Sequence, residues 1–488
     1  MHLSRRPRAA LLAIALSAAL GGLAYAPAST HAKPAGADVV IPYEEFTLPN
    51  GLRVIVHTDR KAPIVAVNVW YHVGSKNETP GRTGFAHLFE HLMFQGSENH
   101  DGEFFTPFEL VGATDQNGTT NQDRTNYFQN VPTTAVDMAL WMESDRMGHL
   151  LGAIDQKALD EQRGVVQNEK RQGENQPYGR RIFARMFEAL YPAGHPYSWQ
   201  TIGSMADLDA ATLDDVKTWF RSWYGPNNAV LVLAGDIDVA TAKEKVTRYF
   251  GDIPASATLA DMKTNIPKHA RDTRETIPDR VPQVRVYRAW PVAEMGTKDA
   301  TLLDLFAQVL GGSAASRFDT RLVHGDKIAD QASAFQWSSE ISSTFFLMST
   351  VKEGVEPAKV EQALDEELKR LVTQGPTAEE LERAKVSGRA AFVRGIERIG
   401  GFGGKSDVLA SCAVYQGTPD CYKEELDILA NATPAEVQAV ARNGWQGPRT
   451  PSSCSPARRR PRPCRKPCSP RPPRSRPPRP TSIRSSRR

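Results

Sequence analysis

Two histidines and one glutamate lie within the five-residue segment His87-Leu88-Phe89-Glu90-His91. On a helix, residues four positions apart project from one face about one turn apart, so His87 and His91 could hold one metal ion between them. Glu90 would lie beside them, where its carboxylate could take a proton from an activated water. This H-x-x-E-H order inverts a common zinc-binding motif and indicates metal-assisted hydrolysis of an acyl bond. Such a short motif also occurs on ordinary solvated helices, so its neighbours decide between the two interpretations.

The residues around the motif predict a strand, a loop and then a helix. Alternating apolar residues predict a strand with one buried face: Val65, Val67, Val69 and Tyr71. A loop rich in turn formers follows at residues 74–81, and a helix is expected to begin near Thr83. The apolar stripe of that helix consists of Phe85, Leu88, Phe89, Leu92 and Met93. The histidines would lie at the edge of this buried face, where a bound metal would offset the cost of burying them.

A catalytic zinc ion usually takes three protein ligands, so a third partner is expected elsewhere in the chain. The best candidate is Glu169, which Val165 and Val166 precede by four and three residues. This spacing predicts that the carboxylate lies on the apolar side of a helix, where it would favour a nearby cation. Without the histidine motif, an ordinary solvated glutamate would be the better interpretation.

Several segments carry a resemblance to a known family. Residues 81–97, GRTGFAHLFEHLMFQGS, resemble the signature of the pitrilysin/insulinase family of zinc metallopeptidases. Further segments are similar to the same family: residues 117–120, 123–127, 165–171, 310–313 and 316–317. The resemblance extends from residue 40 to about residue 445.

The resemblance implies a fold, a cofactor and a reaction. It implies that His87, His91 and Glu169 bind one Zn²⁺ per chain and that Glu90 is the general base. The expected fold is α+β, with two similar domains of the mitochondrial-processing-peptidase-like (LuxS/metallohydrolase-like) type, the second without a metal. The expected activity is that of a zinc-dependent endopeptidase, which hydrolyses peptides or unfolded polypeptides.

One position departs from the family pattern. Family members often have a supporting glutamate seven residues before the metal-binding one, and this chain has Gln162 there. Seven residues return to nearly the same helix face, so Gln162 could still form a hydrogen bond near the site but would supply no charge. Glu161 could compensate, although it is rotated away from that face.

The segment Asn117, Gly118, Thr119 and Thr120 is the candidate for substrate binding. Its small residues would let an extended peptide approach and add a strand to a sheet edge. The alternative is an ordinary turn that leads into a strand.

The charge of the chain is misleading until its two ends are set aside. The whole chain has a formal net charge of +4, but residues 451–488 hold 13 Lys or Arg and 11 Pro without any acid. Residues 1–32 add three Arg and no acid. The remaining body has 44 basic and 56 acidic residues, a net charge of −12. This acidic body removes the support for a nucleic-acid partner.

The N-terminus predicts export to the periplasm or the cell exterior. Three arginines precede an apolar run at residues 9–23, which is typical of a signal peptide spanning residues 1–32. Cleavage could follow Ala26 or Ala32, or the segment could remain as an anchor; no stable membrane span is expected after cleavage. Cys412 and Cys421 could pair in an oxidising compartment, or both could remain free thiols.

The body is long enough for two domains. We expect a zinc-binding catalytic domain at residues 40–250, a proline-containing linker at 251–280 and a non-catalytic homologous domain at 281–445. When Gly312 and Ser313 are aligned with Gly96 and Ser97, the positions of the two histidines and the glutamate hold apolar residues: Leu303, Phe306 and Ala307.

The last residues lose the apolar periodicity of the body. Residues 446–488 cannot bury a core and are expected to be disordered; a frameshift near residue 444 would explain the abrupt change. The Arg/Tyr pair that family members use to bind substrate is also not evident. The missing part could be a second family subunit or a second repeat. The alternative function is therefore a catalytically inactive scaffold, or a half-enzyme subunit that needs a partner.

Overall fold

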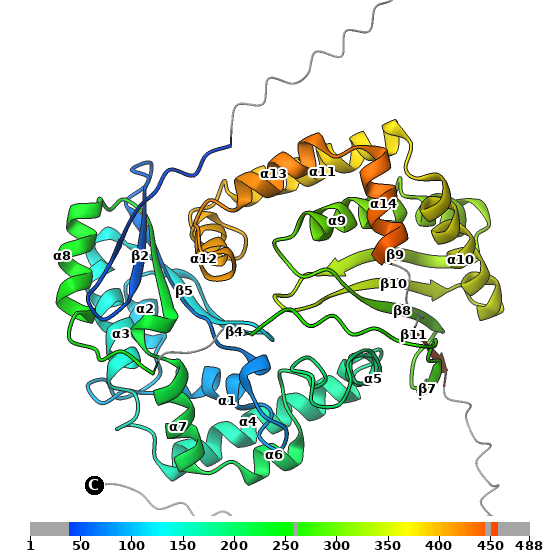
Figure 1. Ribbon diagram of the computed structural model, residues 1–488. Helices are drawn as coiled ribbons and strands as arrows, with labels where there is room; N and C mark the ends of the chain where they lie inside the picture. Colours follow the sequence, from blue (N-terminus) through cyan, green and yellow to red (C-terminus); the bar gives the residue numbers. More distant parts are fainter. Residues whose placement is uncertain (1–38, 258–261, 445–449, 457–488) are drawn as a thin grey trace, which may run out of the picture. The chain divides into compact units, whose positions relative to one another are not determined.

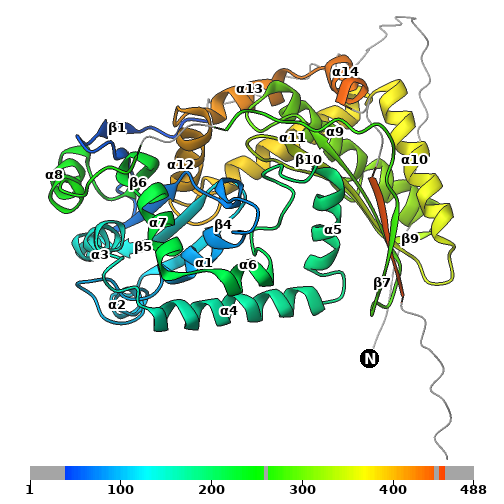
Figure 2. The same cartoon turned by 60° about the horizontal axis from the view of Figure 1, so that its bottom comes forward.

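A computed structural model describes residues 39–257, 262–444 and 450–456 of the chain. The expected signal peptide and most of the arginine-rich tail lie outside these residues. The described part contains two β-sheets, each covered by helices (Figures 1 and 2). None of its helices has the length and apolar character that crossing a membrane would require.

The first sheet has the strand order β1-β2-β6-β3-β5-β4 in the described residues. Its strands are β1 Glu44–Thr47, β2 Arg53–Thr58, β3 Ile64–Tyr71, β4 Thr114–Thr120, β5 Thr125–Pro132 and β6 Ala229–Gly235. All neighbouring pairs are antiparallel except β2 and β6, which are parallel. Strand β4 therefore lies at one edge of the sheet, with only β5 beside it.

Helices from the first half of the chain pack around this sheet. They are α1 Phe85–Leu92, α2 Thr106–Leu110, α3 Val136–Gly148, α4 Gln156–Asn175, α5 Arg180–Leu190, α6 Met205–Ala210, α7 Leu213–Trp223 and α8 Val239–Phe250, with 3-10 turns η1 Ser75–Asn77, η2 Thr133–Ala135 and η3 Pro226–Asn228. The expected apolar stripe of α1 is confirmed, because all five residues are buried.

The second sheet has the order β7-β11-β8-β10-β9. Its strands are β7 Glu275–Asp279, β8 Arg285–Val292, β9 Ala329–Trp337, β10 Ser343–Val351 and β11 Thr450–Pro456. The helices of this half are α9 Lys298–Gly311, α10 Pro357–Gln374, α11 Ala378–Gly395, α12 Lys405–Gln416, α13 Tyr422–Asn431 and α14 Pro434–Gly444, with the π-helical turn η4 Asp319–Gly325. In α9, the aligned residues Leu303, Phe306 and Ala307 are buried apolar side chains, so the second domain holds no counterpart of the histidine motif.

Each half of the chain contributes a helix that packs on the sheet of the other half. Helix α12 of the second half packs on β3 and β6 of the first sheet, where Leu409 and Ala410 join a core with Trp70. Helix α5 of the first half packs on the second sheet, where Met186 and Phe187 join a core with Phe346. The expectation that β3 has one buried face is therefore wrong. Both of its faces are buried, because a distant helix covers the second one.

Two strands lie in ranges that the sequence predicted to be a linker and a disordered tail. Strand β7 lies inside the range expected to be a linker, and β11 lies inside the range expected to be disordered. Strand β11 pairs with β8 and β7 through backbone groups, which a composition-based expectation of disorder does not take into account. Cys412 and Cys421, whose pairing the sequence left open, form a disulfide between α12 and the start of α13.

Candidate metal centre

Helix α1 presents both histidines of the motif, and a buried carboxylate holds its first turn. The helix begins after Gly84, whose φ of 91° is in the left-handed region that favours glycine. The Glu78 side chain accepts hydrogen bonds from the backbone N–H groups of Gly84 at 3.0 Å and Ala86 at 2.9 Å. Two of the free N–H groups at the helix start are thereby satisfied. Burial raises the pKa of Glu78 to about 8, while its hydrogen bonds with the Ala86 and Gly84 N–H groups oppose the rise.

Helix α4 brings Glu169 to the histidines. Its N-cap Asp155 accepts a hydrogen bond from the Ala158 N–H at 2.8 Å, which fixes the start of the helix. The expectation that Val165 and Val166 both mark the buried face is wrong for Val165, which is 43% exposed, whereas Val166 is fully buried. The Glu169 side chain is itself 38% exposed, so it lies at the margin of the core rather than inside it.

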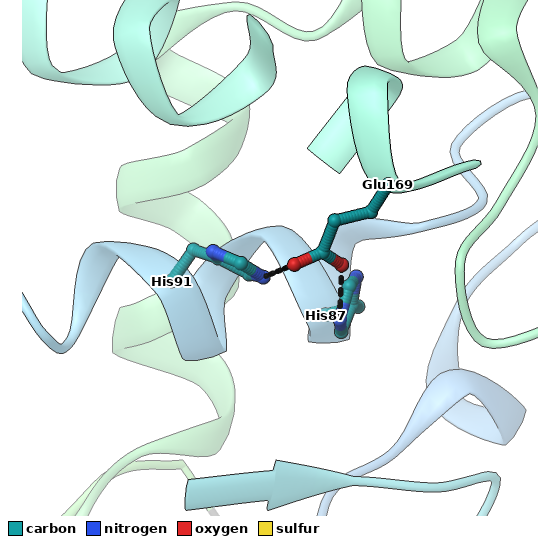
Figure 3. A group of neighbouring side chains, drawn as sticks. All are labelled: His87, His91 and Glu169. Carbon is teal, nitrogen blue, oxygen red and sulfur yellow. Dashed lines mark ion pairs between the residues drawn. The ribbon is translucent and has the colours of Figure 1, made fainter. Parts of the chain in front are cut away.

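The three candidate ligands converge on one point (Figure 3). The carboxylate oxygens of Glu169 lie 3.7 Å from His87 Nε2 and 3.6 Å from His91 Nε2. One donor atom from each residue lies within 4.8 Å of the others, and this is the one such group of three found in the described residues. Ligands about 2.1 Å from a tetrahedral zinc ion would lie about 3.4 Å from one another, which is close to the observed spacing.

Burial keeps both histidines in the form that binds metals. Burial, together with the smaller effects of the nearby His91 and Arg180, lowers the pKa of His87 to about 3. Burial also lowers the pKa of His91, although the Glu169 carboxylate opposes this shift. Neutral imidazoles and a carboxylate are the donor set of many catalytic zinc sites, so these residues fit a zinc ion.

Glu90 lies on the same helix with a carboxyl group largely removed from water. Burial raises the pKa of Glu90 to about 7, while a hydrogen bond with Thr120 and the charge of Arg124 oppose the rise. Its Oε2 atom is buried and has no hydrogen-bond partner among the described residues. An unpaired carboxyl oxygen with a pKa near neutrality suits a general base.

The two supporting residues expected on α4 lie differently. Gln162 is half-buried, and no hydrogen bond joins it to His87, His91 or Glu169 in the described part of the chain. Glu161 is exposed and lies 3.8 Å from Lys157, in an exposed pair one turn back along α4. Neither position supplies a contact to the candidate ligands here, so their supporting roles remain a hypothesis.

Asn117, Gly118 and Thr119 lie within the edge strand β4 rather than in a turn. A Cβ atom on Gly118 would lie 2.5 Å from Phe94 Cζ and 2.8 Å from Tyr127 Cδ1. The missing side chain of Gly118 therefore makes room for rings of the domain itself. The Thr119 carbonyl oxygen accepts a hydrogen bond from Arg124 Nη1 at 2.8 Å. The open edge belongs to the strand as a whole, whose role in binding substrate remains a proposal.

The sequence did not single out three residues at this site. Glu78 holds the start of α1, while the charge of Arg124 acts on Glu90 and that of Arg180 acts on His87. A loop separates Glu78 from the motif, and Arg180 is the first residue of a different helix. No local spacing therefore relates either residue to the histidines.

Two family models match the chain. "Insulinase (Peptidase family M16)" matches residues 53–195, which include all three candidate ligands, and "Peptidase M16 inactive domain" matches residues 210–387. The second match agrees with the absence of the histidine motif from α9.

Individual relatives agree with these models. The "Zinc protease PqqE" of Helicobacter pylori is 28% identical over 397 residues, which are 79% of this chain and 87% of that protein. The "Probable zinc protease PqqL" of Escherichia coli is 25% identical over 355 residues, 69% of this chain and 37% of that protein. A crystal structure of a protease from Helicobacter pylori matches with a TM-score of 0.78 at 25% identity, over 86% of this chain and all of that one. The chain is thus a member of the M16, or insulinase, family of peptidases, with a catalytic-type first domain and an inactive-type second domain.

Proposed function

We propose that this chain is a zinc-dependent endopeptidase that hydrolyses peptides or unfolded polypeptides. The observation that carries the proposal is the convergence of His87, His91 and Glu169, with Glu169 oxygens 3.6 and 3.7 Å from the two imidazoles. The names of the relatives, which are zinc proteases, support the same assignment. One zinc ion per chain is proposed, held by these three residues.

The chemistry follows from the charges of the site. A zinc ion held there would supply a positive charge that acidifies water and polarises a peptide carbonyl. Glu90 takes the proton of the attacking water at its unpaired carboxyl oxygen and returns it to the amine that leaves. In the metal-free chain, burial raises the pKa of Glu90 to about 7.

The substrate is proposed to bind as an extended strand beside β4. That strand has a neighbour on one side only, so the backbone groups of Asn117, Gly118 and Thr119 that point away from β5 lie at the edge of the sheet. Backbone pairing of this kind recognises many sequences, which suits a peptidase for unfolded chains.

Export is the proposed location of the enzyme. The signal-like residues 1–32 and the Cys412–Cys421 disulfide both favour an oxidising compartment, the periplasm or the cell exterior. The relative PqqL has been described as a periplasmic protease. We further propose that residues 40–250 and 281–445 act as the catalytic and the non-catalytic domain.

A peptide-cleavage assay on the full chain tests the proposed activity. Cleavage of an unfolded polypeptide should stop when a chelator removes the metal and should return when zinc is added in equal amount. Cleavage that continues in chelator, with zinc shown to be gone by elemental analysis, would contradict the proposal.

A second candidate function is a half-enzyme that needs a partner. The structural match to the solved PqqL chain extends over 86% of this chain but over only 48% of PqqL. One PqqL molecule is therefore long enough to contain about two such units. The half-enzyme predicts bound zinc with little cleavage by the chain alone and a gain of activity when a second family subunit is added. Full activity of a chain shown to be monomeric would rule it out.

A further inference from the structure

A cavity of about 310 Å³ opens beside the candidate metal centre, and His87 forms part of its wall. Three aromatic side chains line it, two from α5 and one from the end of β9: Phe183, Phe187 and Trp337. The ring of Trp337 meets those of Phe187 and Phe183 edge-on, with centroids 5.9 and 6.4 Å apart. Trp337 remains 41% exposed, so the cavity offers aromatic surface that no described side chain covers.

The wall also holds polar residues, and two of them, Arg180 and Gln200, have unused bonding capacity. Arg180 makes no ion pair with any described residue, and the stem of its side chain packs closely on α4, where a Cβ on Gly173 would lie 2.7 Å from Arg180 Cδ. Gln200 donates a hydrogen bond from Nε2 to the Arg180 carbonyl oxygen at 2.9 Å. The Gln200 Oε1 atom is buried and has no partner in the described part of the chain.

The chemistry of these walls selects one kind of side chain. Aromatic rings favour edge-to-face and offset contact with another ring, and a guanidinium group favours the face of a ring. The guanidinium also repels lysine and arginine side chains. The free acceptor on Gln200 would take a hydrogen bond from a phenol O–H or an indole N–H, and a buried acceptor left unpaired is costly.

We propose that this cavity binds an aromatic side chain of the substrate next to the scissile bond and excludes basic side chains. The assignment rests on the peptidase function proposed above, because the cavity shares His87 with the metal centre. Tyrosine and tryptophan are preferred to phenylalanine, since only they carry a donor for Gln200. Trp337 belongs to the second domain, so that domain takes part in choosing the substrate.

Matched peptides on the zinc-loaded full chain test the selectivity. The peptides differ at one position, which holds Tyr, Phe, Ala or Lys and is moved stepwise across the cleavage site. At the position that brings the varied side chain into the cavity, the Tyr peptide should have a kcat/KM about 10-fold or more above those of the Ala and Lys peptides. The Trp337→Ala variant should lose most of that advantage, mainly through a higher KM.

A charge reversal with a matched control separates Arg180 from a general charge effect. Arg180→Glu should raise the kcat/KM of the Lys peptide and lower its difference from the Tyr peptide. Arg181→Glu makes the same change on the next residue, which is exposed, donates to the Pro278 carbonyl oxygen and is not part of the cavity wall. This control should keep the order of preference. An order that is the same in all four proteins would overturn the assignment.

Peptide binding to the zinc-loaded Glu90→Gln variant distinguishes failure of the cavity from failure of the proposed function. Tighter binding of the Tyr peptide than of the Lys peptide to the variant, together with no peptide cleavage by the zinc-loaded wild-type chain, would keep the cavity and reject the peptidase. Cleavage by wild-type protein with equal binding of both peptides to the variant would reject the cavity and keep the peptidase.

Discussion

Glu90, the proposed general base, carries an electrostatic cost in the folded protein. Its carboxyl group is buried, and the pKa of about 7 means that the folded chain favours the protonated form more than the unfolded chain does. The resulting stabilisation is present below about pH 4.5 and is lost as the pH rises through about 7. The residue proposed to perform proton transfer therefore destabilises the metal-free protein near neutral pH.

Replacing Glu90 should reverse this cost. The metal-free Glu90→Gln variant should gain stability over wild type as the pH rises from 5 to 8, by up to about 3 kcal/mol, because the amide does not ionise. Thermal unfolding in chelator at several pH values measures the difference. The exposed Glu103→Gln is the control and should show no such trend. A constant difference between Glu90→Gln and wild type across this range would show that Glu90 does not titrate as described.

Glu169 should contribute to metal affinity more than other glutamates of its helix. Glu169→Gln removes the anionic ligand and should weaken zinc binding by at least about 100-fold, because loss of even a residue that only supports a ligand costs 10 to 100-fold. Competition with a zinc-sensitive dye measures the change. Glu174→Gln on the same helix, which breaks only a pair with Lys170, should bind zinc like wild type. Equal affinities for the two variants would remove Glu169 from the site.

The residues of the site differ in how far the sequence reveals them. His87, Glu90 and His91 were predictable because helix periodicity alone places them on one turn. Glu169 lies on another helix, and one of the two valines used to orient it is exposed, so the family resemblance carried that prediction further than the spacing did. Arg180 and Trp337 meet in one cavity only after the chain has folded, and no local pattern relates them.

At the scale of elements, Glu78 links the loop after β3 to the helix that carries the histidines. Both of its oxygens accept backbone N–H groups of the first turn of α1. Glu78→Gln should lower stability by about 1 to 3 kcal/mol, since the amide nitrogen would face one of these N–H groups and leave it unpaired. Chemical denaturation measures the loss, and zinc affinity should fall with it. The exposed Glu109→Gln in α2 is the control; a loss no larger than in this control would show that α1 does not depend on its cap.

The order and type of the main elements were predictable, whereas their surroundings were not. Strand β3, helix α1 and helix α9 follow their apolar patterns. The second buried face of β3 could not be inferred, because the helix that covers it, α12, comes from the other half of the chain. Strand β11 takes the same place beside β8 that β6 takes beside β3, yet its sequence is TPSSCSP where β6 has AVLVLAG. This contrast motivates the hypothesis of a frameshift near residue 444, which translation of the downstream DNA in its other frames tests.

At the scale of the whole described body, a buried polar network joins the two halves. Lys76, which is 2% exposed, lies 3.6 Å from Asp123 and also contacts Glu340 in the turn between β9 and β10. Asp123 also accepts a hydrogen bond from the Tyr197 hydroxyl at 2.5 Å and one from the Glu340 N–H at 3.1 Å. Because Asp123 lies between β4 and β5, the network connects the proposed substrate edge to the second domain.

Breaking this network from one side should be costly. Lys76→Met leaves two carboxylates without their shared cation and should lower the free energy of unfolding by about 3 to 5 kcal/mol. Denaturant titration measures the loss. The double variant Lys76→Met with Asp123→Asn should lose less than the sum of the single variants, because one uncompensated charge is removed. Additive losses would show that the two residues do not interact.

The central claim is that one zinc ion and Glu90 act together in peptide hydrolysis by this chain. The most direct test measures zinc content and kcat/KM on the same sample of Glu90→Gln and wild-type protein. We predict one zinc ion per chain in both and a kcat/KM that is about 10² to 10⁴-fold lower in the variant, as expected when a general base is removed. Wild-type cleavage by a zinc-loaded Glu90→Gln chain would contradict the account.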